Sequence, residues 1–565
     1  MDRAPTAFGD AGVTRTFWLI VGGALLIRLW GIHYGLPYVY WIDEYHEVMR
    51  AMELGSGEFN FGRTGKGGFY FLLFFEFGLY FVALKLAGVV STVQEFAEAF
   101  VRDPSAFYLM GRVTAAVFGC ATVAGAGLVA SRAFGTRAGL LAATFVAVNV
   151  LHVDLSHRVG VDVPMTLFAT LALCFALRIS KEGLRKDYLL GGLCAALATT
   201  TKLPGILVLV PLVIAHAYSA ARAGHRPIRW LASSDFWLAA AVFIVVLVLS
   251  NPGILLHFDP MSFYSAPGGD AIDGDDIAGE AIAPATRPNL FTYYLGVLLS
   301  SMGWPLFVVS LLGAGYAAWK RRPADVLLLS YALVHYLAIA GTSSDVLFYP
   351  RYTLPIIVVL AILAGRAVVE VAGTGARSRW TSAVATMMLI AWPLSVAVAN
   401  THALTQTDTR TLAKGWFDAH VPAGSKVLIE GGKIAASRLS VPLADTRESL
   451  DRRIAYWKLQ EPKQAKYLEI MRRVHRGGGY ELEFMQIGSI ADFSAYRDRG
   501  IEYVVVRPDY FIGSRRARGD GSRLIEAMRT DPDVKMIKRF DAGSHGSLGP
   551  AIEIYRIDPG ITHVR

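Results

Sequence analysis

A series of apolar segments, separated by short charged loops, fills most of the first 400 residues. A helix of about 20 apolar residues crosses the hydrocarbon core of a bilayer. The chain is 53% hydrophobic and only 18% charged, less charged than soluble proteins of this length. The sequence therefore predicts a multi-span α-helical membrane protein. The apolar segments are 16–36, 68–90, 107–130, 138–154, 162–180, 188–201, 203–220, 235–251, 291–318, 325–341, 352–370 and 381–399.

The segment 68–90 decides the topology, because every later loop changes side if it spans. Cytoplasmic loops carry an excess of Lys and Arg. If 68–90 lies along the outer surface, five basic loops become cytoplasmic, and the acidic loop between Asp259 and Glu280 becomes extracytoplasmic. We therefore predict eleven spans, with the N-terminus inside, the C-terminus outside and 68–90 as a juxtamembrane helix. The basic loops hold Arg132 and Arg137; Lys181, Arg185 and Lys186; Arg222, Arg226 and Arg229; Lys320, Arg321 and Arg322; and Arg377 and Arg379.

The net charge of +9 is explained by these loops, so the sequence does not indicate nucleic-acid binding. The first segment is too long for a signal peptide and lacks a cleavage site, which predicts a retained span. The three cysteines all lie in apolar segments and show neither disulfide nor metal spacing. These features predict an integral membrane protein, and we expect it in a bacterial inner or plasma membrane.

The composition changes near residue 401, which divides the chain into a transmembrane domain (1–400, with outer juxtamembrane helices in 41–90) and a soluble extracytoplasmic domain (401–565). Strand and helix patterns alternate after this point, which is typical of an α/β domain. No Gly-rich phosphate loop is found. The predicted helices are 408–420, 447–475 and 521–530, and the predicted strands are 426–430, 502–507, 534–540 and 551–557.

Two sites on the predicted outer face carry carboxylates that could act as catalysts. Asp43 and Glu44 directly follow the first span, and Asp162 opens the span at 162–180. A carboxylate can remove the proton of an acceptor hydroxyl as it attacks, which contributes about 10²–10⁴ in rate. The alternative is that Asp43 and Asp162 simply cap the helices that begin there.

The same face carries candidate phosphate-binding cations. The glycines around Lys66 would let a phosphate approach closely, and an arginine fork suits a pair of phosphate oxygens. The alternative is that these cations meet ordinary lipid head groups. A divalent metal is a further candidate cofactor, with Asp43, His46, Glu47 and His257 as candidate ligands; His152 and His157 could also contribute. The predicted substrate-binding residues are Arg63, Lys66, Arg158, Lys202, Arg351 and Tyr352.

Taken in order, these motifs resemble the polyprenyl-phosphate-sugar-dependent glycosyltransferases of the GT-C class, which include protein O-mannosyltransferases and lipid A aminoarabinose transferases. The resemblance covers about residues 16–400. Its elements are Asp43-Glu44, the segment 51–57, Lys66, the loop from Arg158 to Pro164, an "LA…TK.P" hairpin at 197–204, Asn251-Pro252, and an "RY.LP" element within 349–355.

The resemblance implies an inverting transfer of a sugar from a polyprenyl-phosphate donor to a protein, lipid or glycan acceptor at the outer face. It implies that Asp43 is the catalytic base, that Lys66 and Arg351 hold the lipid phosphate, and that Asp162 is a second acidic site. The chain departs from the family at 64–65, where a glutamate often precedes the lysine, and at Gly67-Gly68, where prolines are common. The first departure weakens the case for a metal.

Two other classes of function remain open from the sequence. Polar residues within spans often mark a transport path, so a transporter or lipid flippase is the main alternative. The spans carry few internal charges, however, and no two-half repeat is evident. A non-catalytic scaffold would leave the outer-face charges without a use.

Overall fold

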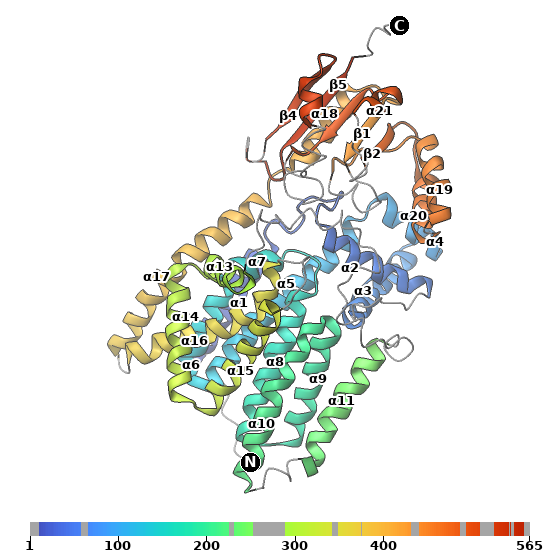
Figure 1. Ribbon diagram of the computed structural model, residues 1–565. Coiled ribbons are helices and arrows are strands. Elements are labelled where there is room, and N and C mark those ends of the chain that lie inside the picture. The colour runs from blue at the N-terminus through green and yellow to red at the C-terminus, as the bar shows by residue number, and fades with distance from the viewer. Residues whose placement is uncertain are drawn as a thin grey trace.

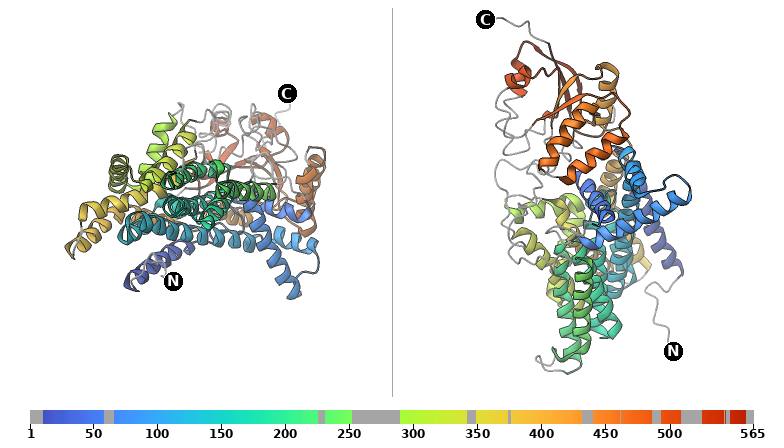
Figure 2. Two further views of the ribbon diagram at one scale, coloured as in Figure 1. Left: turned by 90° about the horizontal axis from the view of Figure 1, so that it is seen from below. Right: turned by 90° about the vertical axis from the view of Figure 1, so that its right-hand side faces the viewer.

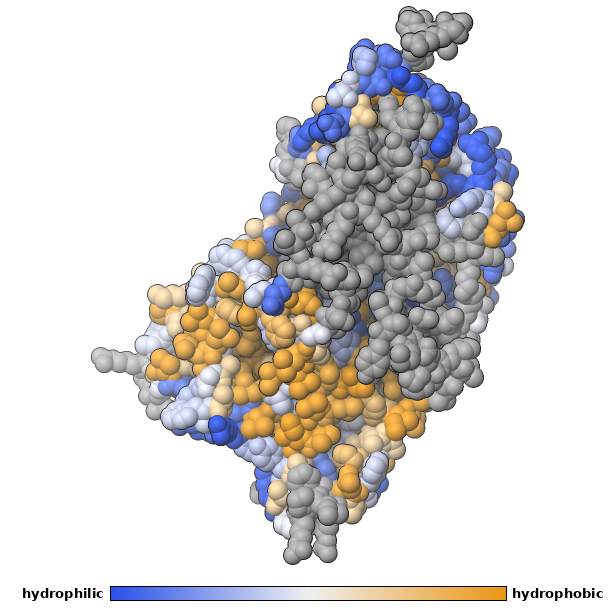
Figure 3. Space-filling view, in the orientation of Figure 1, coloured by the Kyte–Doolittle hydropathy of each residue, from blue (hydrophilic) through white to orange (hydrophobic). Residues whose placement is uncertain are grey.

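The protein consists of a bundle of long helices with a small sheet domain beyond one end of it (Figure 1). This computed structural model describes residues 11–57, 66–224, 231–251, 289–341, 349–373, 376–430, 440–460, 462–485, 493–508, 525–541, 543 and 547–558. The hydrophobic surface lies over the long helices and the hydrophilic surface over the sheet domain (Figure 3). This division agrees with a bundle that sits in a bilayer.

Within the described residues, eight helices are long and apolar enough to cross a membrane, or nine if a bent pair counts as one span. The eight comprise α3 (Gly67–Leu86) and seven others: α1 (Ala11–Leu29), α5 (Ser105–Phe134), α8 (Asp162–Lys181), η3 (Leu203–Val208) with α10 (Leu209–Arg222), α15 (Pro323–Ala340), η6 (Pro350–Thr353) with α16 (Leu354–Ala372), and α17 (Ala376–Ala403). The bent pair is α13 (Leu290–Met302) and α14 (Trp304–Lys320). Shorter members of the bundle are α6 (Thr136–Ala147), α9 (Arg185–Thr201) and α11 (Ser234–Ser250).

Small residues let the bundle helices approach closely. A Cβ on Gly127 of α5 would lie 3.2 Å from the carbonyl oxygen of Gly139 of α6. A Cβ on Gly139 would lie 2.7 Å from the carbonyl oxygen of Gly127. Helices in a membrane gain stability from such close packing, since lipid chains are as apolar as the side chains. The core around α5, α6, α8 and α16 is accordingly buried.

Two predicted spans are interrupted. The segment 291–318 is two helices that bend by 117° at Gly303, whose φ of 76° favours glycine. The segment 138–154 is α6, which ends at Ala147, followed by α7 (Val150–Leu155), which Asn149 caps by accepting a hydrogen bond from the N–H of His152. An apolar pattern alone does not reveal such breaks.

Three helices lie between the bundle and the sheet domain: α2 (Ile42–Glu53), which continues into η1 (Leu54–Ser56), α3, and α4 (Val93–Arg102). By composition α3 qualifies as a span, but it runs across the long helices. It is seen almost end-on in Figure 1 and crosswise in the right-hand view of Figure 2. This course is compatible with the predicted juxtamembrane position of residues 68–90.

The C-terminal domain is a five-stranded mixed sheet with the order β2-β1-β3-β5-β4. β1 pairs in parallel with β2 and β3, and β5 pairs antiparallel with β3 and β4. The strands are β1 (Lys426–Glu430), β2 (Glu481–Met485), β3 (Tyr503–Val506), β4 (Val534–Phe540) and β5 (Ile552–Ile557), and the helices are α18 (Thr409–His420), α19 (Arg447–Gln460), α20 (Pro462–Val474) and α21 (Phe493–Asp498).

Most predicted elements of this domain are present, with three differences. The short helix α21 was not predicted. The predicted helix 447–475 is two helices, because Pro462 cannot continue α19 and begins α20. The strand β2 was not predicted, since the charged Glu481 and Glu483 alternate with its apolar residues on a half-exposed edge.

The two domains are joined at defined contacts. Tyr40, just before α2, shares a 2.7 Å hydrogen bond with Thr411 of α18, and its ring packs against Arg410. The core between α19 and α20 also packs against Tyr45 of α2. The sheet domain therefore contacts the short helix that carries Asp43.

Candidate active site

One end of the bundle gathers six charged side chains, which we call the charge cluster: Asp43, Glu47, Lys66, Asp162, Lys202 and Arg351. They come from α2, the N-terminus of α3, the N-terminus of α8, the C-terminus of α9 and η6. The sequence placed five of the six on one face as candidate catalytic or phosphate-binding residues. The structure brings those five together.

The helix α2 supplies two of the carboxylates. Asp43 and Glu47 are four residues apart, so they lie on one face of the helix. Asp43 forms an ion pair with Arg351, and Glu47 accepts a 2.6 Å hydrogen bond from Lys66 Nζ. The cap of α2 is Trp41 and makes no side-chain cap bond, so Asp43 does not cap this helix.

The other half of the charge cluster centres on Asp162. Its Oδ1 accepts a 2.5 Å hydrogen bond from Lys202, and its Oδ2 lies 3.7 Å from Arg351 Nε. Val161 is the cap of α8, so the capping interpretation of Asp162 is also wrong. Arg351 thus bridges the carboxylates of α2 and α8.

Two tyrosines of the RY.LP region pack their rings against the cations Lys202 and Arg351. Lys202 Nζ lies 4.5 Å from the centre of the Tyr352 ring, and the Arg351 guanidinium lies 3.8 Å from that of Tyr349. Such contacts stabilise a cation without using its hydrogen bonds. Tyr349 belongs to the motif but was not predicted as a substrate-binding residue, although its place two residues before Arg351 could have suggested it.

Glu44 was predicted as catalytic, but the structure places it away from the charge cluster. It is fully buried and takes two 2.8 Å hydrogen bonds from Arg112 of α5. The backbone N–H of Val159 donates a third bond to it, at 2.9 Å. We interpret Glu44 as a residue that holds α2 against α5.

Arg158 was predicted to bind phosphate or to pair with Asp162. The structure pairs it with Asp154, four residues earlier, at 2.9 Å. Its guanidinium also packs on the ring of Trp41, 3.2 Å from the ring centre. Arg158 therefore supports the start of α2, beside the charge cluster.

The glycines after Lys66 pack against the ends of neighbouring helices. A Cβ on Gly67 would lie 1.8 Å from the Ser250 carbonyl oxygen. The N–H of Gly67 donates to Asn251 Oδ1 at 2.9 Å, and that of Gly68 donates to Thr200 Oγ1 at 3.0 Å. These residues let α3 begin against the ends of α9 and α11, which fixes the position of Lys66.

The candidate metal ligands do not form a metal site in the part of the chain that the structure describes, where no group of three His, Cys, Asp or Glu side chains could hold an ion. Asp43 and Glu47 each pair with a cation. His152 and His157 lie among the bundle helices, bonded to Arg28 and to the Trp30 carbonyl. Two predicted residues, Arg63 and His257, lie outside the described residues.

The pKa values of the charge cluster follow from burial and charge. Burial would raise the pKa of Asp43, but nearby cations, Arg351 first, outweigh it and hold the pKa below its ordinary value. Burial would lower the pKa of Lys66, but Glu47 raises it above its ordinary value. For Lys202 burial prevails over Asp162 and lowers the pKa to about 8. Asp43 is therefore ionised at neutral pH, and Lys202 is close to titration.

Burial also lowers the pKa of His46, despite the opposing charge of Asp43. Its Nε2 is buried and has no hydrogen-bond partner among the residues that the structure describes. His46 is therefore a neutral neighbour of Asp43 on α2.

Comparisons with known proteins bear on the fold and the family. Residues 108–251 match the PMT_2 family, described as dolichyl-phosphate-mannose-protein mannosyltransferase. The apo crystal structure of ArnT from Cupriavidus metallidurans is 12% identical, with 96% of this chain and 98% of that chain covered and a TM-score of 0.51. No curated protein sequence matches the chain.

Two further solved structures are similar at lower TM-scores. ArnT from Cupriavidus metallidurans bound to undecaprenyl phosphate is 12% identical over 95% of this chain and 97% of that chain, with a TM-score of 0.48. The apo oligosaccharyltransferase of Archaeoglobus fulgidus is 12% identical over 91% of this chain and 72% of that chain, with a TM-score of 0.47.

The apo ArnT structure confirms the predicted fold class, a multi-span helical membrane protein with a C-terminal sheet domain. The motifs that indicated a GT-C enzyme lie on both sides of the matched segment and within it. The resemblance to GT-C glycosyltransferases predicted from these motifs is thereby confirmed: residues 108–251 are similar to the PMT_2 family, and the chain has a fold similar to that of apo ArnT.

Proposed function

We propose that this protein transfers a sugar from a polyprenyl-phosphate donor to an acceptor hydroxyl at the outer face of the membrane, with inversion at the anomeric carbon. The observation that carries this proposal is the chain of contacts Asp43–Arg351–Asp162–Lys202, with Lys66 on Glu47 beside it. It joins carboxylates to cations at one end of the bundle. A base for the acceptor and charges for a departing phosphate are the two things that this reaction requires.

Asp43 is the base in this proposal. The acceptor oxygen attacks the anomeric carbon from the side opposite the phosphate, and its proton passes to an Asp43 carboxylate oxygen. The bond from the anomeric carbon to the phosphate oxygen breaks, and its electron pair leaves with the polyprenyl phosphate. Asp43 is one-third exposed, so an acceptor can reach it.

Lys66, Lys202 and Arg351 hold the phosphate in this proposal. All three are less than one-quarter exposed, and charges act more strongly where water is excluded. Because each of them pairs with a carboxylate in the structure, an incoming phosphate competes with those carboxylates for the cations.

This competition gives the donor a second effect. Arg351 helps to keep the pKa of Asp43 low, which makes Asp43 a weak base. When the donor phosphate draws Arg351 away, the pKa of Asp43 rises toward its ordinary value or above it. Donor binding would thus strengthen the base when the acceptor can react.

The outer-face location rests on the distribution of charge. The end of the bundle away from the charge cluster carries Arg132, Arg137, Lys181, Arg222 and Lys320 near helix ends. An excess of cations marks the cytoplasmic side. We infer that the N-terminus is cytoplasmic and that the sheet domain is extracytoplasmic.

The donor class rests on the family and on the geometry together. ArnT from Cupriavidus metallidurans, whose apo form shares this fold, has also been solved bound to undecaprenyl phosphate. In this chain, the cations of the charge cluster lie at the ends of apolar helices, where a lipid phosphate would meet them. The proposal leaves a protein, lipid or glycan as the acceptor, to be identified by the assay.

The test is a sugar-transfer assay in membranes with a panel of labelled polyprenyl-phosphate sugars and endogenous acceptors. We expect wild type to transfer one of these sugars and Asp43→Asn to lose about 10²–10⁴ in rate, because the general base is removed. Glu98→Gln on α4 is the matched control, since it changes the same charge on another outer-end helix.

A second arm measures inversion by determining the anomeric configuration of the product. Equal transfer by wild type and Asp43→Asn, with both proteins folded, would remove Asp43 as the base. Retention of configuration would exclude the single displacement proposed here.

A further inference from the structure

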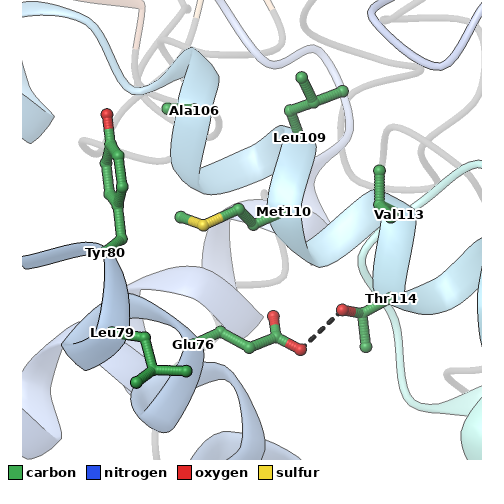
Figure 4. Close-up of a pocket in the computed structure, with 8 residues that line it drawn as sticks. All are labelled: Glu76, Leu79, Tyr80, Ala106, Leu109, Met110, Val113 and Thr114. Carbon is green, nitrogen blue, oxygen red and sulfur yellow. Dashed lines mark hydrogen bonds between the residues drawn. The ribbon is translucent and has the colours of Figure 1, made fainter. Parts of the chain in front are cut away.

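A groove between α3 and α5 lies apart from the charge cluster and has no part in the reaction above (Figure 4). Its volume is about 650 Å³, within the range that holds small ligands in proteins. The walls are mostly apolar: Leu79 and Tyr80 on α3 face Leu109, Met110 and Val113 on α5. Leu79, Leu109 and Val113 are more than one-third exposed, so the groove is open to its surroundings.

The position of the groove indicates lipid as its occupant. It forms where α3 crosses α5, at the level between the long helices and the sheet domain (Figure 1). If the bundle spans a bilayer, this level is where head groups meet acyl chains. An apolar groove there can take a hydrocarbon chain along its walls and leave a head group at its polar end.

Glu76 supplies that polar end. Its Oε1 accepts a 2.6 Å hydrogen bond from Thr114 Oγ1. Its Oε2 is buried and has no hydrogen-bond partner among the described residues, and in Figure 4 it points toward Met110. No cation that the structure describes pairs with this carboxylate. A buried carboxylate oxygen without a donor is costly, so a ligand that brings a positive donor would stabilise it.

We propose that this groove binds one phospholipid with a primary ammonium head group. The ammonium donates a hydrogen bond to Glu76 Oε2, and an acyl chain packs along Leu79, Leu109 and Val113. The ammonium satisfies both deficits of Glu76, the missing donor and the missing positive charge. This proposal does not depend on the sugar transfer, so either can fail without the other.

The test is native mass spectrometry of the purified full-length protein with phosphatidylethanolamine or phosphatidylcholine of identical acyl chains. The two lipids differ in the three methyl groups that remove the ammonium donors. We expect phosphatidylethanolamine to bind about tenfold more tightly, as a charged hydrogen bond contributes about this much. Glu76→Gln should lower that preference to near unity, because the amide keeps the shape but not the charge.

A pair of variants on α3 tests the place of binding. Leu79→Trp should fill the groove and weaken both lipids, whereas Val82→Trp should leave them unchanged, because Val82 is half-exposed on the same helix and does not line the groove. The proposal is overturned if wild type binds the two lipids equally or if Glu76→Gln keeps the preference. Displacement of phosphatidylethanolamine by undecaprenyl phosphate, one for one, would also overturn it and assign the groove to the donor's tail.

Discussion

Asp43 and Glu44 are neighbours on α2, but they form ion pairs of two different kinds. Asp43 pairs with Arg351 at a site where the side chains are 33% and 15% exposed, respectively, and Arg351 also approaches Asp162. Glu44 pairs with Arg112 where both side chains are fully buried. The first pair belongs to a cluster that shares its cations, and the second is closed.

The closed pair is enclosed by protein groups that take most of its hydrogen bonds. Arg112 gives Nε and Nη2 to Glu44 and donates through Nη1 to the carbonyls of Ile32 and Tyr34. The pair Asp325–Arg366 at the other end of the bundle is similarly buried. A carboxylate–arginine pair thus stabilises the fold where both partners are buried. A similar pair can bind a substrate where the arginine contacts more than one carboxylate near the surface.

The largest effect on stability is expected from breaking the closed pair. Arg112→Met leaves the Glu44 charge buried without a partner, which costs about 3–5 kcal/mol. Thermal unfolding of purified protein in detergent would measure this loss. Arg351→Met is the matched control and should cost less than about 1 kcal/mol, since its partner Asp43 can be hydrated.

The double variant Glu44→Leu/Arg112→Leu should recover most of the stability, because replacement of both partners by apolar groups is often close to neutral. Equal losses in Arg112→Met and Arg351→Met would contradict the distinction between closed and shared pairs.

The largest effect on substrate binding is expected from Arg351 itself. Arg351→Met should raise the donor KM about 10- to 100-fold, since a charged hydrogen bond to phosphate is lost. Arg351→Lys should have a donor KM between those of wild type and Arg351→Met, because lysine keeps the charge but lacks the two-pronged guanidinium. Steady-state transfer kinetics at varied donor concentration would measure both. An unchanged donor KM with a reduced kcat would show that Arg351 does not bind the donor and acts only by controlling the pKa of Asp43.

The sequence predicted the shared cluster better than the closed pair, and the reason is physical. Charge distribution and helix ends placed Asp43, Lys66, Asp162, Lys202 and Arg351 on one face, which requires only the order of the spans. Whether Glu44 joins them depends on the rotation of α2 against α5, where Arg112 lies inside an apolar segment. No local pattern encodes that rotation.

The fold shows the same limit. The multi-span class follows from hydropathy, and four of the five strands were predicted because they alternate or are continuously apolar. The bend at Gly303 depends on contact with a distant helix, since a Cβ there would lie 2.5 Å from the Trp392 ring. Such tertiary contacts decide where an apolar run breaks.

A smaller effect on stability is expected at Gly67, the residue with which α3 begins against the end of α11. Gly67→Ala would force a Cβ onto the Ser250 backbone, which cannot move aside easily, and overpacking of this kind costs about 1–3 kcal/mol. Gly78→Ala on the same helix has open space around its Cβ and should be neutral or slightly stabilising. Thermal unfolding compares the two. A larger loss for Gly78→Ala would show that α3 is not held at its N-terminus.

The smallest effect, and the sharpest test of the shared cluster, is the pH dependence of Lys202. Its pKa is lowered to about 8, so the charged fraction falls from about nine-tenths at pH 7 to about one-tenth at pH 9. Loss of this charge leaves Asp162 less compensated and weakens phosphate binding, so the donor KM should rise severalfold over this interval. Lys202→Arg keeps its charge throughout and should flatten the rise. If Lys202→Arg shows the same rise as wild type, another group sets the pH dependence, and Lys202 belongs with the closed pairs that only hold the fold.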